Sequence, residues 1–169
     1  MKQSIFFCFV LFIITFTSCK YSSSYKKQAF VNDFSVEYPP YLQKAHGIHP
    51  SALLQTKNDY RDIFFIAGMA EKGNDSSAFK TYCDTTVKLL TSVLKEPMIV
   101  LDTTFINHQN LLVREIKLTA WLNEKQMFYM IDFYFGKDNY FQTTTGFFNS
   151  KRNVWEKDME IACRSLQEL

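Results

Sequence analysis

The sequence has no cluster of like charges. Lysine and arginine together number 19 and aspartate and glutamate 17, and runs of like charge do not exceed pairs such as Lys26-Lys27 and Lys151-Arg152. Proteins that bind nucleic acid carry a clustered basic footprint. The even charge distribution therefore excludes nucleic acid as the expected partner, and it excludes a purely electrostatic attachment to anionic lipid.

Glycine is scarce, at five residues, and the motifs in which glycine serves catalysis are missing. The sequence contains no Gly-x-Ser-x-Gly and no glycine-rich phosphate loop. Asp75, Ser76, Ser77 and Asp84 are explained by helix capping and a polar helix face rather than by a catalytic triad. These absences exclude the classes of enzyme that such motifs mark, and we expect a protein that is not an enzyme.

Cysteine is also infrequent, with four residues in the chain. Cys83 and Cys163 lie on the apolar faces of two predicted helices. A structural disulfide fits them, because an exported protein can form one. Two buried free thiols fit equally, because free cysteine is commonly buried. The sequence leaves both alternatives open, and Cys8 is a filler within an apolar run.

That apolar run, from Ile5 to Phe16, follows a short N-terminus with one positive side chain. It is too short for a membrane-spanning helix, which needs about 20 apolar residues. A basic start, an apolar core of this length and small residues at its end are typical of a secretory signal peptide. The alternative is a buried strand or helix of the domain, but the run lacks the periodicity of either and a polar segment follows at once.

The run ends in Phe16-Thr17-Ser18-Cys19. This tetrapeptide resembles the lipobox of bacterial lipoproteins, although leucine is usual where Phe16 stands. The resemblance implies signal peptide 1–18, cleavage before Cys19, a diacylglyceryl group on the Cys19 sulfur and a further acyl group, such as palmitate, on its amine. Lys20 follows in place of the aspartate that often signals inner-membrane retention, which favours the outer membrane. Several acyl chains together anchor a protein durably, whereas one holds marginally.

Residues 19–29 are polar and have little apolar surface to bury, so we expect a flexible tether with lipidated Cys19 at its start. The remainder, 30–169, has the length of one domain. Alternation predicts a strand over 30–38, two more over 52–57 and 62–70, and four strands between 98 and 148 joined by short polar connections. Short connections favour antiparallel neighbours. Apolar residues at helical spacing predict helices over 78–94 and 150–167.

These elements predict an α+β domain with an antiparallel sheet of six or seven strands and two main helices packed on it. Alternation within 112–120 also predicts that the face bearing Val113, Glu115, Lys117 and Thr119 meets solvent or a loosely covering element.

The body resembles the PsbP-like superfamily, which includes bacterial lipoproteins of the DcrB type. The features that carry the resemblance are the opening "FSVEYP" at 34–39, a helix after the third strand, a four-strand meander and a closing helix with an aromatic residue near its start. The resemblance implies a central antiparallel sheet with helices on its faces and a role in binding proteins or assisting assemblies. It implies no shared catalytic residues, so it assigns no catalytic, metal or cofactor-binding residue here.

His46 and His49, in "HGIHP", are the best metal-like pair. A zinc site needs three or four ligands, which here would have to come from carboxylates or His108. The alternative function is therefore an envelope metal-assisted hydrolase using His46 and His49; otherwise they are solvent-exposed loop histidines. The aromatic stretch 127–135 is typical of a core, although Tyr129 or Phe133 on an open sheet face would offer a patch for a partner.

Taken together, the sequence predicts a lipid-anchored protein of the cell envelope, in the outer membrane and facing either the periplasm or the cell surface, that binds or assembles without catalysis. Its expected contacts are the membrane, through the lipid anchor, and an envelope protein or small ligand. We expect no cofactor.

Overall fold

The computed structural model describes residues 24–30, 33–72 and 76–169. Cys19 and the predicted signal peptide 1–18 lie outside these residues. The helices are α1 (Ser76–Val93) and α2 (Arg152–Arg164), the latter preceded by the short 3-10 helix η1 (Asn149–Lys151). The strands are β1 (Lys26–Phe30), β2 (Phe34–Tyr38), β3 (Gln43–Lys44), β4 (Leu54–Asn58), β5 (Ile63–Glu71), β6 (Lys95–Ile106), β7 (Leu112–Leu122), β8 (Lys125–Phe135), β9 (Asn139–Phe148) and β10 (Gln167–Glu168).

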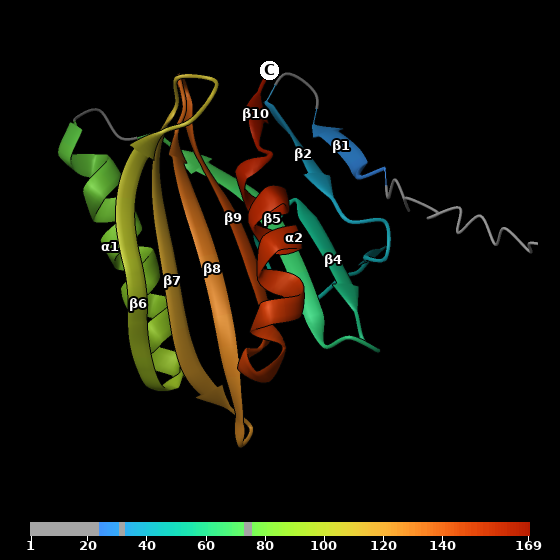
Figure 1. The fold of residues 1–169 in the computed structure, drawn as a ribbon. Coiled ribbons are helices and arrows are strands. Elements are labelled where there is room, and N and C mark those ends of the chain that lie inside the picture. The colour runs from blue at the N-terminus through green and yellow to red at the C-terminus, as the bar shows by residue number, and fades with distance from the viewer. Residues whose placement is uncertain (1–23, 31–32, 73–75) are drawn as a thin grey trace, which may run out of the picture.

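Seven strands form the main sheet, in the order β3-β4-β5-β9-β8-β7-β6, and every neighbouring pair is antiparallel. β6 to β9 are the predicted meander, and β5 pairs with β9 rather than with the strand that follows it. The prediction of an α+β fold with an antiparallel sheet of six or seven strands and two main helices is confirmed, with seven strands in the main sheet (Figure 1). Neither helix within the described chain has both the length and the apolar character that a membrane crossing requires.

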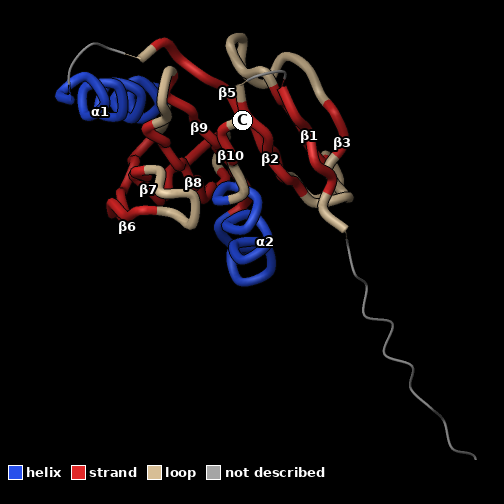
Figure 2. Tube along the Cα trace, turned by 90° about the horizontal axis from the view of Figure 1, so that it is seen from above, coloured by secondary structure: helices blue, strands red, loops and turns tan. Residues whose placement is uncertain are grey.

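The two helices lie on opposite faces of this sheet (Figure 2). Successive residues of a strand point to opposite faces, and β8 shows the consequence. Phe128, Met130 and Tyr134 belong to the core under α2, whereas Tyr129, Ile131 and Phe133 belong to the core under α1. A single sheet therefore carries two hydrophobic cores, one on each side.

A second, three-stranded sheet, β1-β2-β10, shares the α2 side. Phe34 and Val36 of β2 are fully buried in the same core as Met159 and Cys163 of α2. The last strand arises because α2 ends at Arg164, three residues before the predicted end. The chain then turns, and Gln167 pairs with Ser35.

The predicted tether is too long at its C-terminal end. Lys26–Phe30 form β1, which pairs with β2 from Lys26 opposite Tyr38 to Phe30 opposite Phe34. Tyr25 packs against the core, and its hydroxyl donates to the carbonyl oxygen of Asp158 at 3.4 Å. β1 has few apolar residues because it is an exposed edge strand, which is held by backbone pairing rather than by burial. Residues 25–29 therefore belong to the folded domain.

Candidate functional site

α1 covers only part of its face of the sheet. It packs over β7, β8 and β9 through Phe79 and Cys83, and it leaves the β5 side of that face without a helix. A cleft of about 500 Å³ remains between α1, the floor of β5 and β9, and the loop that contains Ile48 and Ala52. This volume lies within the range of about 300–1,000 Å³ that small-molecule sites occupy.

One stripe of α1 and alternate residues of β5 form most of the lining. The stripe repeats at three- and four-residue steps, as one side of a helix does. The two sets are Tyr82, Thr86, Leu89, Leu90 and Val93 from α1, and Phe64, Ile66, Gly68 and Ala70 from β5. None of the described residues that line the cleft is aspartate, glutamate, lysine or arginine. The cleft therefore suits an uncharged, mainly apolar group, because a buried charge would find no partner there.

Three polar side chains that line the cleft, one from α1 and two from β9, bond to one another. The Tyr82 hydroxyl donates to Gln142 Oε1 at 3.2 Å, and Gln142 Nε2 donates to Thr144 Oγ1 at 2.8 Å. Burial, with a smaller contribution from the neighbouring Cys83, raises the pKa of Tyr82 to about 12. The hydroxyl therefore stays protonated and neutral at physiological pH, and the floor offers a few oriented dipoles without charge.

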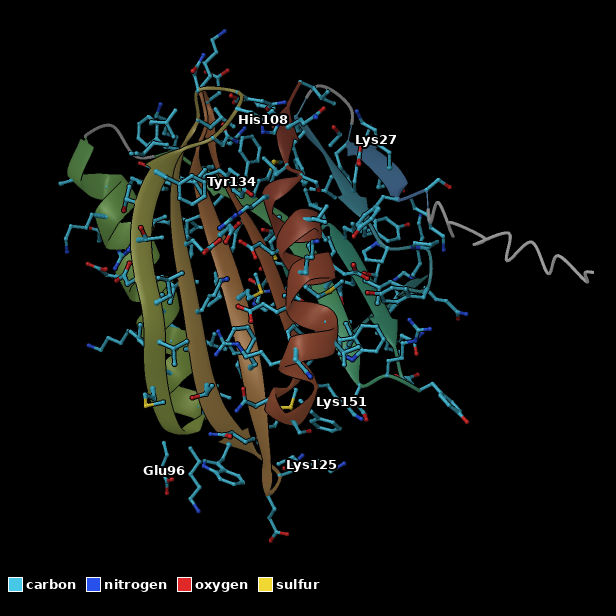
Figure 3. The ribbon with its side chains drawn as sticks, in the orientation of Figure 1. Lys27, Glu96, His108, Lys125, Tyr134 and Lys151 are labelled. Atoms are coloured by element: carbon cyan, nitrogen blue, oxygen red, sulfur yellow. The ribbon has the colours of Figure 1, made fainter. Side chains whose placement is uncertain are left out.

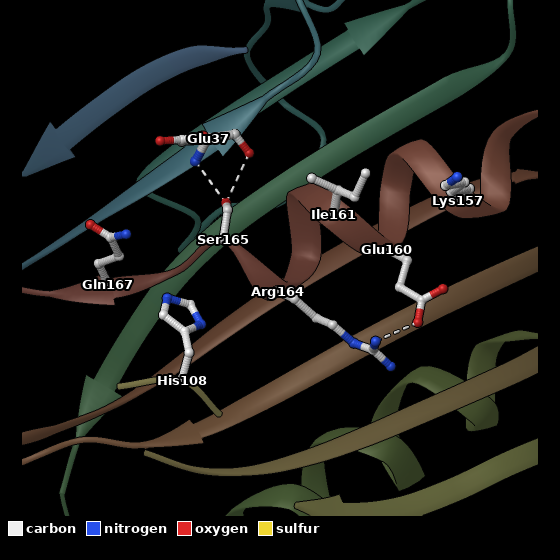
Figure 4. A pocket seen from close by; sticks show the side chains of 8 residues that line it. All are labelled: Glu37, His108, Lys157, Glu160, Ile161, Arg164, Ser165 and Gln167. Carbon is white, nitrogen blue, oxygen red and sulfur yellow. Dashed lines mark hydrogen bonds and ion pairs between the residues drawn. The ribbon is translucent and has the colours of Figure 1, made fainter. Parts of the chain in front are cut away.

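The structure does not bring the three histidines together. His49 lies at the rim of the cleft, where its Nδ1 is 3.1 Å from Ser51 Oγ, while His46 is exposed and outside the lining. His108 lines a separate hollow beside α2 (Figure 4). Across the described chain, no group of three or more histidine, cysteine, aspartate and glutamate residues could hold a metal ion. The two loop histidines thus lack the additional ligands that a metal-assisted hydrolase would need.

The hollow beside α2, also about 500 Å³, has charged side chains in its lining, among them Lys157, Glu160 and Arg164. Arg164 forms one side of it, and its Nη1 contacts Glu160 at 2.6 Å. The same guanidinium reaches inward, where Nη2 and Nε donate to Glu115 Oε2 at 2.8 and 3.0 Å. The guanidinium of Arg164 is therefore paired with two carboxylates, one at the surface and one buried.

The polar face of β7 is buried, contrary to the prediction that it meets solvent or a loose cover. α2 lies over it, so Val113 and Glu115 are fully buried and only 8% of Lys117 is exposed. Burial is tolerated because α2 supplies partners of opposite charge: Arg164 for Glu115, and Glu156, at 3.0 Å, for Lys117. Alternation along one strand reveals that a face is polar, but not which helix will compensate its charges.

Glu115 of β7 and Asp132 of β8 are directly opposite in the register, and Thr143 of β9 continues the same row. Both carboxyl groups are fully buried. Burial, and next the negative charge of Glu115, raise the pKa of Asp132 to about 8, although Arg164 and Lys117 oppose the shift. Asp132 therefore carries a proton at neutral pH. Among the described residues, Glu115 Oε1 and Asp132 Oδ1 have no hydrogen-bond partner.

The row of buried polar groups holds α2 in place. The hydroxyl of Thr143 donates to the carbonyl oxygen of Cys163 at 3.1 Å, and the hydroxyl of Tyr134 donates to the same oxygen. Figure 3 shows Tyr134 on the sheet, beside the upper end of α2. Because α2 shields these groups from solvent, we interpret them as a structural attachment and not as a binding site.

Cys83 and Cys163 occupy the two separate cores, on opposite faces of the sheet. Within the described chain both thiols are free and buried. Burial raises the pKa of Cys83 to about 12, so this thiol stays protonated. Of the two alternatives that the sequence left open, the structure has the free thiols.

Searches with the sequence alone find no relative. No protein-family model matches the chain, and no curated protein matches it. Solved structures do match. Cyanobacterial PsbP (CyanoP) from Synechocystis sp. PCC 6803 superposes with a TM-score of 0.67 at 8% identity, over 91% of this chain and 99% of that one. The chain has a PsbP-like fold.

Two further structures share the PsbP-like fold. PA94 from Pseudomonas aeruginosa, a protein of unknown function, matches with a TM-score of 0.54 at 11% identity, over 83% of this chain and 94% of that one. LpqN of Mycobacterium tuberculosis, which is involved in cell envelope biogenesis, matches with a TM-score of 0.58 at 5% identity, over 87% and 86%. At these identities the likeness shows the fold alone.

Of the residues that line the cleft, the sequence analysis singled out His49 and Tyr129. Phe133 and Tyr129 are buried, as a core requires, but Tyr129 also lines the cleft floor. The signal that could have revealed the cleft lies in α1: Leu89, Leu90 and Val93 make the apolar stripe wider than one packed core needs. A helix buries only the side that faces the sheet, so the extra width indicates a second apolar contact.

Proposed function

We propose that this protein is a lipid-anchored protein of the cell envelope that binds, without catalysis, an uncharged apolar group in the cleft beside α1. The group would be part of a small ligand or an apolar segment of an envelope partner. The cleft carries the proposal: it has the size of a ligand site and an apolar lining without charged side chains. An extended apolar surface that stays open on a monomer commonly marks a binding site.

The anchor in this proposal is Cys19, and Lys20 favours the outer membrane. Between Cys19 and Tyr25, which packs on the domain, the six residue steps span about 22 Å at most. The domain would therefore remain close to the headgroups. The envelope role of LpqN, which has the same fold, supports the location.

The cleft can be tested with two neighbouring threonines of α1. Thr86 lines the cleft, whereas Thr85 is exposed and outside the lining. The chain from residue 20 onward would be titrated with an uncharged naphthylamine dye whose fluorescence rises in apolar surroundings. We expect saturable binding to the wild type, about tenfold weaker binding to Thr86→Trp, and unchanged binding to Thr85→Trp.

Equal binding by the two tryptophan variants, or no saturable binding by the wild type, would contradict the proposed cleft. Circular dichroism of each variant confirms that the helix has formed, so a loss of dye binding can be assigned to the filled cleft rather than to unfolding.

A further inference from the structure

The main sheet has one protected edge and one bare edge. The protected edge is β3, which is two residues long, and the bare edge is β6, with 12 residues. Figure 1 shows β6 along the outer margin of the sheet, and in Figure 3 Glu96 and His108 lie near its two ends. Within the described chain no strand pairs with its outer side. A long edge strand presents a row of backbone donors and acceptors to any strand that can pair with it.

β6 exposes apolar side chains on both faces of the sheet. Leu101 pairs with Lys117 on the α2 face, and Ile106 pairs with Leu112 on the α1 face. Their exposed fractions are 36% and 58%. A helix laid on the sheet would cover one face only, whereas a strand added beside β6 contacts both. The distribution of exposed apolar surface therefore indicates a partner strand.

The first half of β6 is poorly shaped for such pairing. Pro97 has no backbone N–H, Glu96 has a positive φ of 51°, and the register with β7 shifts before Met98 and again before Leu101. These are features by which proteins block edge pairing. From Leu101 to Ile106 the register with β7 is unbroken. Six regular residues are a typical strand length, so this segment is the part of the edge that is open to a partner.

We propose that Leu101–Phe105 pairs antiparallel with the same segment of a second copy of this chain, with the two-fold axis at Thr103. In this register Thr103 lies opposite itself, Leu101 lies opposite Phe105, and Asp102 lies opposite Thr104. Each pair shares one face of the sheet, as directly opposed residues must. The two seven-stranded sheets then continue into each other.

The side chains of β6 favour a second copy of this chain as the partner. Leu101 and Phe105 form an apolar pair twice, once on each side of the axis, and the self-opposed threonines form a favourable pair. Asp102 never faces its own copy, and its carboxylate is already paired with Arg114 at 2.8 and 3.0 Å. A second copy brings matching residues by symmetry, because a two-fold interface uses the same surface twice. The proposal does not depend on the cleft or its ligand.

Two cysteine substitutions test the register. The protein, in membranes, is oxidised mildly and examined on a non-reducing gel, and the amount of crosslinked dimer from the wild type with its native cysteines is the baseline. At the axis the two Cα atoms fall within the roughly 4.4–6.8 Å that a disulfide spans. We expect Thr103→Cys to give a crosslinked dimer. The two copies of residue 104 would lie farther apart than the two copies of residue 103. Thr104→Cys should therefore give no more crosslinked dimer than the wild type.

A second measurement tests the association itself. Sedimentation of the full chain in density-matched detergent should give a dimer for the wild type, a monomer for Leu101→Asp, and a dimer for the control Val154→Asp, which changes an exposed residue of α2. Circular dichroism checks that Leu101→Asp folds. A wild type that stays monomeric at every concentration, or equal crosslinking at positions 103 and 104, would overturn the proposal.

Discussion

Among the described carboxyl groups, Asp132 has a pKa far from that of an exposed aspartate. Its pKa rises from 3.8 to about 8 on folding. Between these values the folded chain binds a proton that the unfolded chain does not, so the free energy of unfolding falls as the pH rises across this window and levels off above about pH 8.

Asp132→Asn should remove that dependence, because the amide is neutral at every pH. We expect the free energy of unfolding of the wild type to fall more steeply than that of the variant between about pH 4 and 8, by about 1 kcal/mol per pH unit. Near pH 8 the variant should be at least as stable as the wild type. Denaturant titrations at a series of pH values measure both curves. Parallel curves would show that Asp132 is already ionised in the folded protein.

The buried charges of β7, Glu115 and Lys117, also show what a sequence reveals about single residues. Alternation identified Glu115 and Lys117 as one polar face of a strand, and that face exists. Their burial depends on Arg164 and Glu156, which lie far along the chain on α2. Similarly, the spacing of His46 and His49 suggested a metal pair, but only the folded structure shows that no third ligand from residues 24–30, 33–72 and 76–169 joins them.

At the scale of elements, the periodic segments were predicted and the weakly patterned ones were not. The two helices and strands β4 to β9 have strong apolar periodicity, and all appear in the predicted order, although α2 ends at Arg164 and β6 already begins at Lys95. β1 and β10 have little apolar pattern, because each gains its order by pairing with β2. Long-range backbone pairing of this kind leaves no local signal in the sequence.

The corrected boundary of the domain gives a prediction for β1. A chain that begins at residue 24 should be as stable as a longer one, whereas a chain that begins at residue 31 should lose about 2 kcal/mol. The loss arises because the ring of Phe30 stacks on Phe34, with 4.7 Å between centroids, and because β2 loses a paired neighbour. Thermal and denaturant unfolding of the two truncated chains measure it. Equal stability would place β1 outside the cooperative unit.

For the whole molecule, the membrane anchor is the prediction with the simplest test. Cys19→Ser should leave the domain folded, because Cys19 precedes every described residue, and it should remove the acyl chains that provide the membrane affinity. Metabolic labelling with a fatty-acid analogue, followed by membrane fractionation, measures both effects. The size of the product shows whether residues 1–18 were removed, since an uncleaved apolar segment could hold the variant at the membrane.

Absence of label from the wild type, or equal labelling and processing of Cys19→Ser, would show that Cys19 is not lipidated. In that case the cleft and the bare edge of β6 remain as described, since neither depends on the N-terminal segment.

The pairing of β1 with β2 has a mechanical consequence for a protein held by its N-terminus. The two strands form a hairpin whose closed end is at Phe30 and Phe34 and whose open end is at Lys26, opposite Tyr38. A pull from Cys19 acts on the open end, so the hydrogen bonds would break one after another, as in a zipper, rather than all at once in shear. Under load β1 would separate from β2 first and lengthen the tether by about 17 Å. The cleft and both cores would stay intact.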